Sequence, residues 1–241
     1  MTLMDERIKE IKKFWDTRAK EYGADRQATL REKYLRLLEI KTMKRLIRRY
    51  SPKRVLDVGC GNGYSTNLYA REFPDIEFVG MDYSEEMIQH ARTSAVPNCH
   101  FFVGDVLDRA SLTEGDFDII LSQRCLQNLP DYELQQKAIG NLLTHKNPDG
   151  HMLLMECSKD GVAQLNGLRM RMGKKPIENI EPWHNNFFED RLLRADFGAE
   201  ILYFSSTYML FAKVIHSRLS PLGYLLPALG KFGYDRLYII K

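Results

Sequence analysis

Short apolar runs alternate with longer amphipathic segments along the chain. Each run is bounded by Gly, Pro, Asn or Asp, which favour turns, and such runs predict buried strands. The segments between them place apolar residues three and four positions apart, a spacing that predicts helices with one buried face. The predicted strands are 55–58, 77–82, 100–104, 117–122, 151–157, 200–207 and 234–241; the predicted helices are 5–21, 29–49, one opening at 64, 84–91, one following 131, 165–172 and 189–195. Residues 147–150 predict a turn before the fifth strand, and the alternation as a whole predicts an α/β fold.

The first predicted strand runs directly into a glycine-rich loop. Residues 55–66 read V-L-D-V-G-C-G-N-G-Y-S-T, with Gly59, Gly61 and Gly63 between the strand and the helix that opens at Tyr64. Because glycine has no Cβ, backbone N–H groups of such a loop can approach a ligand closely, so the loop predicts a nucleotide-like ligand. The dinucleotide fingerprint has its third glycine where Tyr64 stands. A nicotinamide-dependent oxidoreductase is therefore disfavoured and is kept only as an alternative.

Acidic residues follow the first three predicted strands in order. Asp57 lies at the end of the first strand, Asp82 ends the second, 19 residues after Gly63, and Asp105 follows the third. An acid at the tip of the second strand accepts the ribose hydroxyls of a nucleotide in related folds. Each acid alone is equally consistent with a capped turn, which Asp favours. Their joint alternation with strands favours a nucleotide site.

With these residues in place, D-x-G-x-G-x-G at the end of the first strand resembles motif I of the class I S-adenosylmethionine (SAM) methyltransferases. The resemblance covers residues 50–157 and implies a Rossmann-like, seven-stranded, mostly parallel sheet whose last two strands form a hairpin. It implies that SAM is the cofactor, that Asp105 meets the adenine amine and that Val106 contacts the adenine ring. The implied cofactor-binding residues of the core are Asp57, Gly59, Cys60, Gly61, Gly63, Asp82, Tyr83, Asp105, Val106, Ser122 and Gln123.

The N-terminal 50 residues are predicted to form a helical cap on a core of residues 51–241. The stretch F-W-D-x-R-A-x-x-Y-G resembles the segment that closes over the cofactor in many small-molecule methyltransferases, which implies cofactor contacts from Trp15, Arg18 and Tyr22. A guanidinium suits a carboxylate bidentately, so Arg18 is the candidate partner of the methionyl carboxylate. A solvated charge on an amphipathic helix is the alternative interpretation of Arg18.

Two insertions are predicted on the substrate side, at about 158–190 and 208–233. The first contains P-W-H-N-N-F-F, which supplies a candidate general base, His184, within an apolar wall. Glu156, at the tip of the fifth strand, is the second candidate base, and Arg124 is a third catalytic candidate. His184 is equally consistent with a structural histidine, and Glu156 with a cap of the following loop. The second insertion is apolar and proline-punctuated, and we interpret it as a lid or as a homodimer contact.

The amino-acid composition further limits the functions and partners that the chain is expected to have. Lys and Arg number 35 and Asp and Glu 32, giving a net charge of +3, which by itself predicts no nucleic-acid partner. A basic helix face over residues 31–49 is the strongest nucleic-acid signal, and we interpret it as solvated because acids interrupt it and aromatics are not interleaved. The four cysteines lack C-x-x-C pairing, which predicts reduced thiols and a cytoplasmic setting. No metal-ligand spacing is present, and no apolar run reaches the length of a membrane span.

The pattern therefore predicts a SAM-dependent methyltransferase that acts on a small molecule, at oxygen and with a sugar as the candidate acceptor. An RNA or protein methyltransferase using the basic helix 31–49 stays an alternative. A SAM-binding module without catalysis and the nicotinamide-dependent oxidoreductase are alternatives from other classes.

Overall fold

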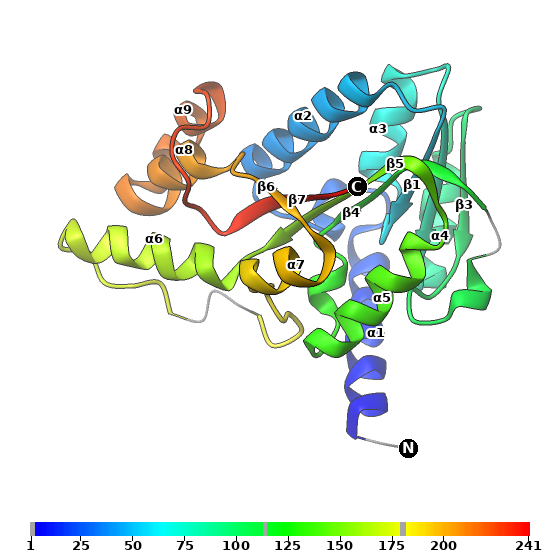
Figure 1. The fold of residues 1–241 in the computed structure, drawn as a ribbon, viewed down its shortest axis with the longest axis horizontal. Coiled ribbons are helices and arrows are strands. Elements are labelled where there is room, and N and C mark those ends of the chain that lie inside the picture. The colour runs from blue at the N-terminus through cyan, green and yellow to red at the C-terminus, as the bar shows by residue number, and fades with distance from the viewer. Residues whose placement is uncertain (1–2, 113–114, 179–181) are drawn as a thin grey trace.

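The computed structural model describes residues 3–112, 115–178 and 182–241 as a twisted sheet covered by helices on both faces (Figure 1). The strands are β1 (Arg54–Val58), β2 (Glu77–Asp82), β3 (Cys99–Val103), β4 (Phe117–Gln123), β5 (Lys146–Cys157), β6 (Glu200–Leu202) and β7 (Asp235–Ile240). The helices are α1 (Leu3–Tyr22), α2 (Lys33–Tyr50), α3 (Tyr64–Glu72), α4 (Glu85–Thr93), α5 (Tyr132–Leu143), α6 (Lys159–Arg171), α7 (Asp190–Phe197), α8 (Ser206–Met209) and α9 (Ser220–Leu225).

The sheet has the strand order β3-β2-β1-β4-β5-β7-β6. Strands β1 to β5 pair in parallel, whereas β7 runs antiparallel to both β5 and β6. The predicted seven-stranded, mostly parallel sheet is therefore confirmed. The order reverses between β1 and β4, and this switch point brings the loops at the carboxyl ends of both strands to one crevice, where ligands of α/β sheets bind.

The core lies on both faces of the sheet. Val55 is in register with Phe78 and Ile119, and these three side chains belong to a buried cluster that also contains residues of α2 and α3. Leu56, the next residue of β1, belongs to a second cluster that includes residues of α5 and α7. This alternation follows from the two-residue period of a strand, and it explains why the central strands are apolar on both sides.

Side-chain caps define where two of the helices begin. The Ser84 hydroxyl accepts a hydrogen bond from Met87 N at 3.2 Å, and an Asp131 carboxylate oxygen accepts one from Leu134 N at 2.8 Å. Both caps satisfy a donor that the first turn of a helix leaves free. The helices predicted to begin at these two positions are therefore found there.

Four predicted boundaries were wrong, and the first is the start of the second helix, predicted at residue 29 and found at Lys33. Residues 147–150 were predicted as a turn but belong to β5. The register between β4 and β5 shifts between Phe117 and Ile119, and Gly150 fits at this point because a Cβ there would lie too close to Asp118 O. Strand β6 ends at Leu202, and the chain turns into α8 at Ser206. Helix α6 begins at Lys159, six residues before the predicted start, because the Ser158 hydroxyl accepts from Gly161 N at 3.0 Å.

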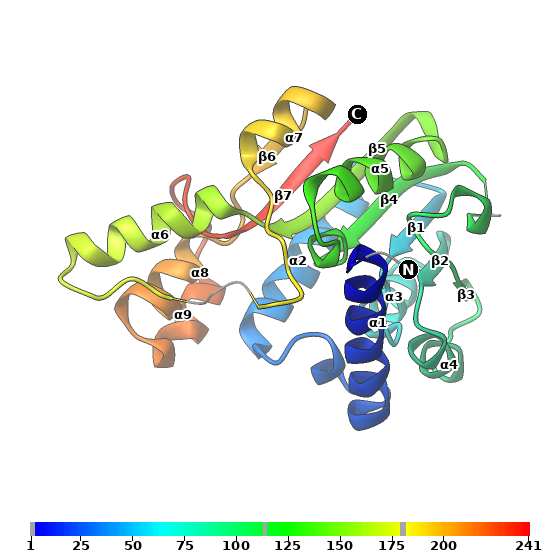
Figure 2. The same ribbon diagram turned by 90° about the horizontal axis from the view of Figure 1, so that it is seen from below.

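The insertion 208–233 packs beside α2 and the end of α6. Tyr224 of α9 lies 6.1 Å from the ring of Tyr34, and the Tyr208 hydroxyl donates to Glu32 at 3.1 Å. Figures 1 and 2 both place α6, α8 and α9 at one end of the molecule, away from β3. In the described ranges, no helix is long and apolar enough to cross a membrane.

Candidate active site

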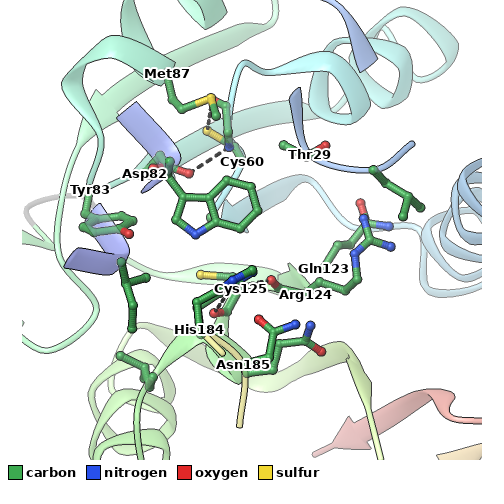
Figure 3. Close-up of a pocket in the computed structure, with 18 of the residues that line it drawn as sticks. Thr29, Cys60, Asp82, Tyr83, Met87, Gln123, Arg124, Cys125, His184 and Asn185 are labelled. Carbon is green, nitrogen blue, oxygen red and sulfur yellow. Dashed lines mark hydrogen bonds between the residues drawn. The ribbon is translucent and has the colours of Figure 1, made fainter. Parts of the chain in front are cut away.

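A cavity of about 400 Å³ lies at the carboxyl ends of β1, β2 and β4, with α1 on one side (Figure 3). Its lining includes the glycine-rich loop, Asp82, Tyr83 and Asp105. Other lining residues come from α1, from the loop after β4, from residues 182–187 and from the start of β7. Segments far apart in the chain therefore meet around one space. In Figure 3, Cys60, Asp82 and Met87 lie on one side of this space and His184 and Asn185 on the opposite side.

The loop after β1 holds its shape through backbone contacts that require glycine. Gly59 has φ +69°, and its N–H donates to Met81 O at 2.8 Å. A Cβ at Gly59 would clash with the side chain of Cys125, so the loop after β1 and the loop after β4 touch directly. Gly61 has φ +55° and approaches Thr29 in the same way. Because these glycines have no side chain, the backbone of the loop after β1 lines the cavity directly.

The acid at the tip of β2 is fixed by two backbone donors. One carboxylate oxygen of Asp82 accepts from Gly61 N and the other from Ser84 N, each at 2.9 Å. Burial raises the pKa of Asp82 to about 6, although both hydrogen bonds act to lower it. Tyr83 follows, with a buried hydroxyl that has no hydrogen-bond partner among the described residues. Asp105 is exposed at the rim of the cavity, where it accepts from Leu107 N at 2.9 Å.

A buried arginine reaches the floor of the cavity from α2. Arg36 is only 4% exposed, lies 3.4 Å from Ser65 Oγ and 3.7 Å from a Glu39 oxygen, and also donates to Thr29 Oγ1. Burial lowers the pKa of Arg36 to about 10, so the guanidinium stays charged at neutral pH. Its Nε has no partner within the described part of the chain. The cavity therefore offers a buried cation with a free donor.

Asp57 stands beside this cation at the end of β1. It is 3% exposed and accepts a hydrogen bond from Thr66 Oγ1 at 2.5 Å. Burial raises the pKa of Asp57 to about 7, while the hydrogen bond from Thr66 and the charge of Arg36 act to lower it. Asp57 thus ties β1 to α3 and places a titratable group at the floor of the cavity.

The side of the cavity opposite Asp82 carries a histidine. His184 is half-buried, stacks on Phe14 at 4.5 Å and meets the edge of Trp15 at 5.7 Å between ring centroids. Burial, and then the charge of Arg18, lower the pKa of His184, so its imidazole is neutral at neutral pH. Its Nδ1 has no partner among the residues the structure describes. Neutral imidazole with a free nitrogen is able to accept a proton.

A second unpartnered acceptor lies at the start of β7. One oxygen of Asp235 accepts from Cys157 Sγ at 3.3 Å, whereas the other is buried and lacks a partner in the described ranges. Burial and the charge of Glu39 raise the pKa of Asp235 to about 7, and Arg124 acts to lower it. Arg124 itself forms an ion pair with Glu39 of α2. Glu39, which also lies 3.7 Å from Arg36, therefore has Arg124 as its nearer cation.

Residues 50–188, more than half of the chain, match the sequence model of a family described as a methyltransferase domain. The chain belongs to the class I SAM-dependent methyltransferases. This match confirms the predicted resemblance to the class I methyltransferases and the prediction of SAM as the cofactor. The alternative of a nicotinamide-dependent oxidoreductase is set aside.

Curated methyltransferases resemble the chain over part of their length. The malonyl-[acyl-carrier protein] O-methyltransferase of Bacillus anthracis is 31% identical over 154 residues, which are 62% of this chain and 55% of the relative. The trans-aconitate 2-methyltransferase of Escherichia coli O139:H28 (strain E24377A / ETEC) is 40% identical over 99 residues, 41% of this chain and 36% of the relative. The matches thus span about half of these relatives or less. The magnesium protoporphyrin IX methyltransferase of Synechocystis PCC 6803, solved with bound SAH (S-adenosylhomocysteine), is 17% identical, covers 92% of each chain with a TM-score of 0.59, and shares the fold.

The cofactor of this methyltransferase family fits the residues of the cavity. A SAM molecule carries an adenosine with two ribose hydroxyls and a methionyl carboxylate. The carboxylate of Asp82 suits the hydroxyls, and the buried Arg36, with its unpartnered Nε, suits the carboxylate. The Tyr83 hydroxyl, buried without a partner in the described chain, is a further polar atom left for a ligand.

Sequence reasoning missed Arg36 and favoured Arg18 in its place. Arg18 is not among the residues that line the cavity; its guanidinium donates to Ala28 O at 3.0 Å and to Gln27 O and lies 4.4 Å from the ring of Tyr22. Tyr22 is likewise absent from the lining, whereas Trp15 is part of it. Arg36 had been assigned to the solvated basic face. Its spacing of four and seven residues from the apolar Ile40 and Met43 was the available signal that this cation lies on the buried face of the helix.

Two other candidates act within the protein rather than at the cavity. Ser122 and Glu156 are fully buried and do not line the space. The Ser122 hydroxyl donates to Glu156 at 2.8 Å, and the carboxylate of Glu156 also accepts from the backbone N–H groups of residues 125, 126 and 127 at 3.1–3.3 Å. Glu156 therefore lacks access to a substrate and orders the loop after β4. The remaining candidates that line the cavity are Gly59, Cys60, Gly61, Asp57, Asp82, Tyr83, Asp105, Val106, Gln123, Arg124 and His184, whereas Gly63 is not part of the lining.

Proposed function

We propose that this chain transfers the methyl group of SAM to a hydroxyl of a small, hydroxyl-rich acceptor such as a sugar. When bound, SAM supplies an electrophilic methyl on its sulfonium. Methyl transfer needs the acceptor oxygen about 3–3.5 Å away on the line of displacement, with water excluded. The observation that carries the proposal is that His184 and Asp235 both line one cavity, and that each has a buried side-chain atom, Nδ1 and Oδ2, without a hydrogen-bond partner among the described residues.

Each residue has a role in this proposal. Asp82 accepts from the ribose hydroxyls, Asp105 and Val106 meet the adenine, and Arg36 binds the methionyl carboxylate. His184 takes the proton of the acceptor hydroxyl, because its lowered pKa keeps the imidazole neutral. Asp235 accepts a hydrogen bond from a second hydroxyl and so orients the acceptor.

Charge supports a hydroxyl over a carboxylate as the acceptor group. Both curated relatives named above carry acidic acceptors in their names. Among the described residues that line the cavity, Arg36 and Arg124 are the basic side chains other than His184. Arg36 is assigned to the cofactor, and Arg124 is paired with Glu39. No further cation of the described lining is then left for an acidic acceptor, whereas one oxygen of Asp235 has no donor in the described ranges.

The first experiment fixes the cofactor. Calorimetric titration of the purified chain with SAM, S-adenosylhomocysteine and NADH is run beside an Asp82→Ala variant. We expect micromolar binding of the first two ligands, weakened in the variant, and none of NADH. Binding of NADH alone would overturn the proposal.

The second experiment tests the acceptor. Transfer of a labelled methyl group is measured with paired probes, free hexoses and their nucleotide-linked forms against trans-aconitate and malonate. We expect methylated hexose, a kcat at least about 100-fold lower in His184→Gln, in line with loss of a general base, and a raised acceptor KM in Asp235→Asn. Methyl ester formation on the acids, with no product from any hexose, would refute the hydroxyl assignment and leave the cofactor assignment intact.

The basic helix 31–49 supplies little free charge for the RNA alternative. Arg36 is buried, and Lys44 and Arg48 both pair with Glu72, at 2.5 and 2.6 Å. Titration with tRNA at low and high salt separates the two classes, because phosphate contacts lose affinity steeply as salt is added. Tight binding at low salt that disappears at high salt would favour the RNA alternative.

A further inference from the structure

One end of the molecule exposes an unusual amount of apolar surface. Ten large hydrophobic side chains are exposed among the described residues, and six of them belong to the end of α6 and to α9 with its following loop. We call this set the apolar end; its members are Met170, Met172, Leu222, Leu225, Leu226 and Leu229, each between 45% and 68% exposed. Figures 1 and 2 both show α6 and α9 at the same end. Exposed apolar side chains gathered at one end of a molecule are typical of an interaction site.

The apolar end is held rigid from behind. Gly223 is buried, and a Cβ there would lie 2.8 Å from Tyr208 Cα, so α9 sits directly on α8. Tyr224 packs beside Tyr34 of α2, and Lys174 Nζ donates to Ile215 O at 2.6 Å, which ties the end of α6 to the same unit. The protein thus anchors α9 by one side and leaves its leucines in water.

The segments that carry these side chains contain Lys and Arg residues but no Asp or Glu. Residues 161–177 and 201–234 together hold seven Lys and Arg residues and no Asp or Glu, in a chain with 32 acidic residues. Four of these basic residues are exposed beside the apolar side chains: Arg171, Lys175, Arg218 and Lys231. The same segments therefore expose both apolar and positively charged side chains.

We infer that the apolar end docks on an anionic lipid surface. Leucine and methionine side chains enter the boundary between headgroups and acyl chains, while basic side chains contact the anionic headgroups. A twofold contact between two copies would place the same basic residues against each other, which disfavours a second copy as the occupant. A nucleic acid would contact the Lys and Arg side chains but would leave the six apolar side chains in water. The inference does not rest on the proposed reaction, since its test measures binding to vesicles.

The test is co-sedimentation of the full chain with vesicles of phosphatidylcholine, with and without phosphatidylglycerol. We expect binding only to the vesicles with phosphatidylglycerol, weaker at high salt. Leu225→Asp/Leu229→Asp should abolish it, and Arg171→Gln/Lys175→Gln should lower it by about fivefold per charge removed. Leu3→Asp, at an 87% exposed leucine of α1, is the matched control and should bind like the unchanged chain.

Each other outcome overturns the inference. Absence of binding to vesicles with phosphatidylglycerol refutes it, and so does binding that the Leu225→Asp/Leu229→Asp change leaves intact. Sedimentation equilibrium on the same proteins detects the competing occupant: a dimer that this double variant dissociates, without vesicle binding, assigns the apolar end to self-association. Calorimetry with S-adenosylhomocysteine confirms that each variant is folded, and a failure there leaves the vesicle result of the unchanged chain as the deciding measurement.

Discussion

Two substitutions of Glu156 distinguish a structural role of its carboxylate from a catalytic role. In Glu156→Ala, the backbone N–H groups of residues 126 and 127, which are buried, and of residue 125, which is partly buried, lose their acceptor. A buried donor left unsatisfied costs about 1–3 kcal/mol, so the two buried donors should lower the free energy of unfolding by at least about 2 kcal/mol. In Glu156→Gln, the amide oxygen still accepts, and one donor at most meets the new NH₂ group, so the loss should stay near 1 kcal/mol.

Urea unfolding at pH 6 measures both variants. At this pH the carboxyl of Glu156 is largely protonated, because burial raises its pKa to about 7, and removing it therefore removes little charge. Glu133→Ala, at an exposed first-turn position of α5, is the control and should change stability by less than about 0.5 kcal/mol. The reasoning fails if Glu156→Ala unfolds like the unchanged chain, or if Glu156→Gln keeps its stability and loses methyl transfer, since the carboxyl would then act in the chemistry.

Two further predictions concern charge. Burial raises the folded-state pKa of Asp57, Glu156 and Asp235 to about 7 and that of Asp82 to about 6, above the ordinary values of 3.8 and 4.5. The folded state thus holds protons more tightly, and its stability should fall as the pH rises from about 4.5 to 6 for Asp82 and to 7 for the other three groups. Thermal melting against pH checks this, and a melting temperature that rises over the interval contradicts it. Arg36→Gln should weaken S-adenosylhomocysteine binding about 10- to 100-fold and spare 5′-methylthioadenosine, which has no carboxylate; if calorimetry finds this pattern in Arg18→Gln instead, Arg18 is the partner.

The sequence predicted the parallel half of the sheet well because its signals there are local. A strand that ends in an acid and a glycine loop carries its own turn chemistry, and β2 begins and ends at the predicted residues, Glu77 and Asp82. The cap at Ser84 is equally local. The sequence failed where a distant contact decides the outcome: Arg36 reads as one more base on an amphipathic helix until α2 is docked over the glycine loop. Glu156 likewise reads as exposed at a strand tip, and only the fold of the loop after β4 buries it.

The same distinction applies to the candidate site. The cofactor half follows from motifs within 50 residues of one another, and Asp57, Asp82 and Asp105 all line the cavity. The opposite half joins α1, the residues around His184 and the start of β7. Asp235 was missed because nothing near it in the sequence marks a ligand, and its place depends on where the last strand enters the sheet.

The reversed direction of β7 has a consequence for how this fold can diverge. An antiparallel strand begins at the edge of the sheet where its parallel neighbours end, so the first residue of β7, Asp235, emerges beside the tip of β5. The Ser205 hydroxyl fixes this point by donating to Asp235 O at 2.6 Å. The two ends of the segment between Ser205 and Asp235 are therefore joined by this hydrogen bond. Apart from Tyr234, which lines the cavity, the length and surface of this segment are able to change without moving the carboxylate, so this end of the molecule and its cavity are able to evolve separately.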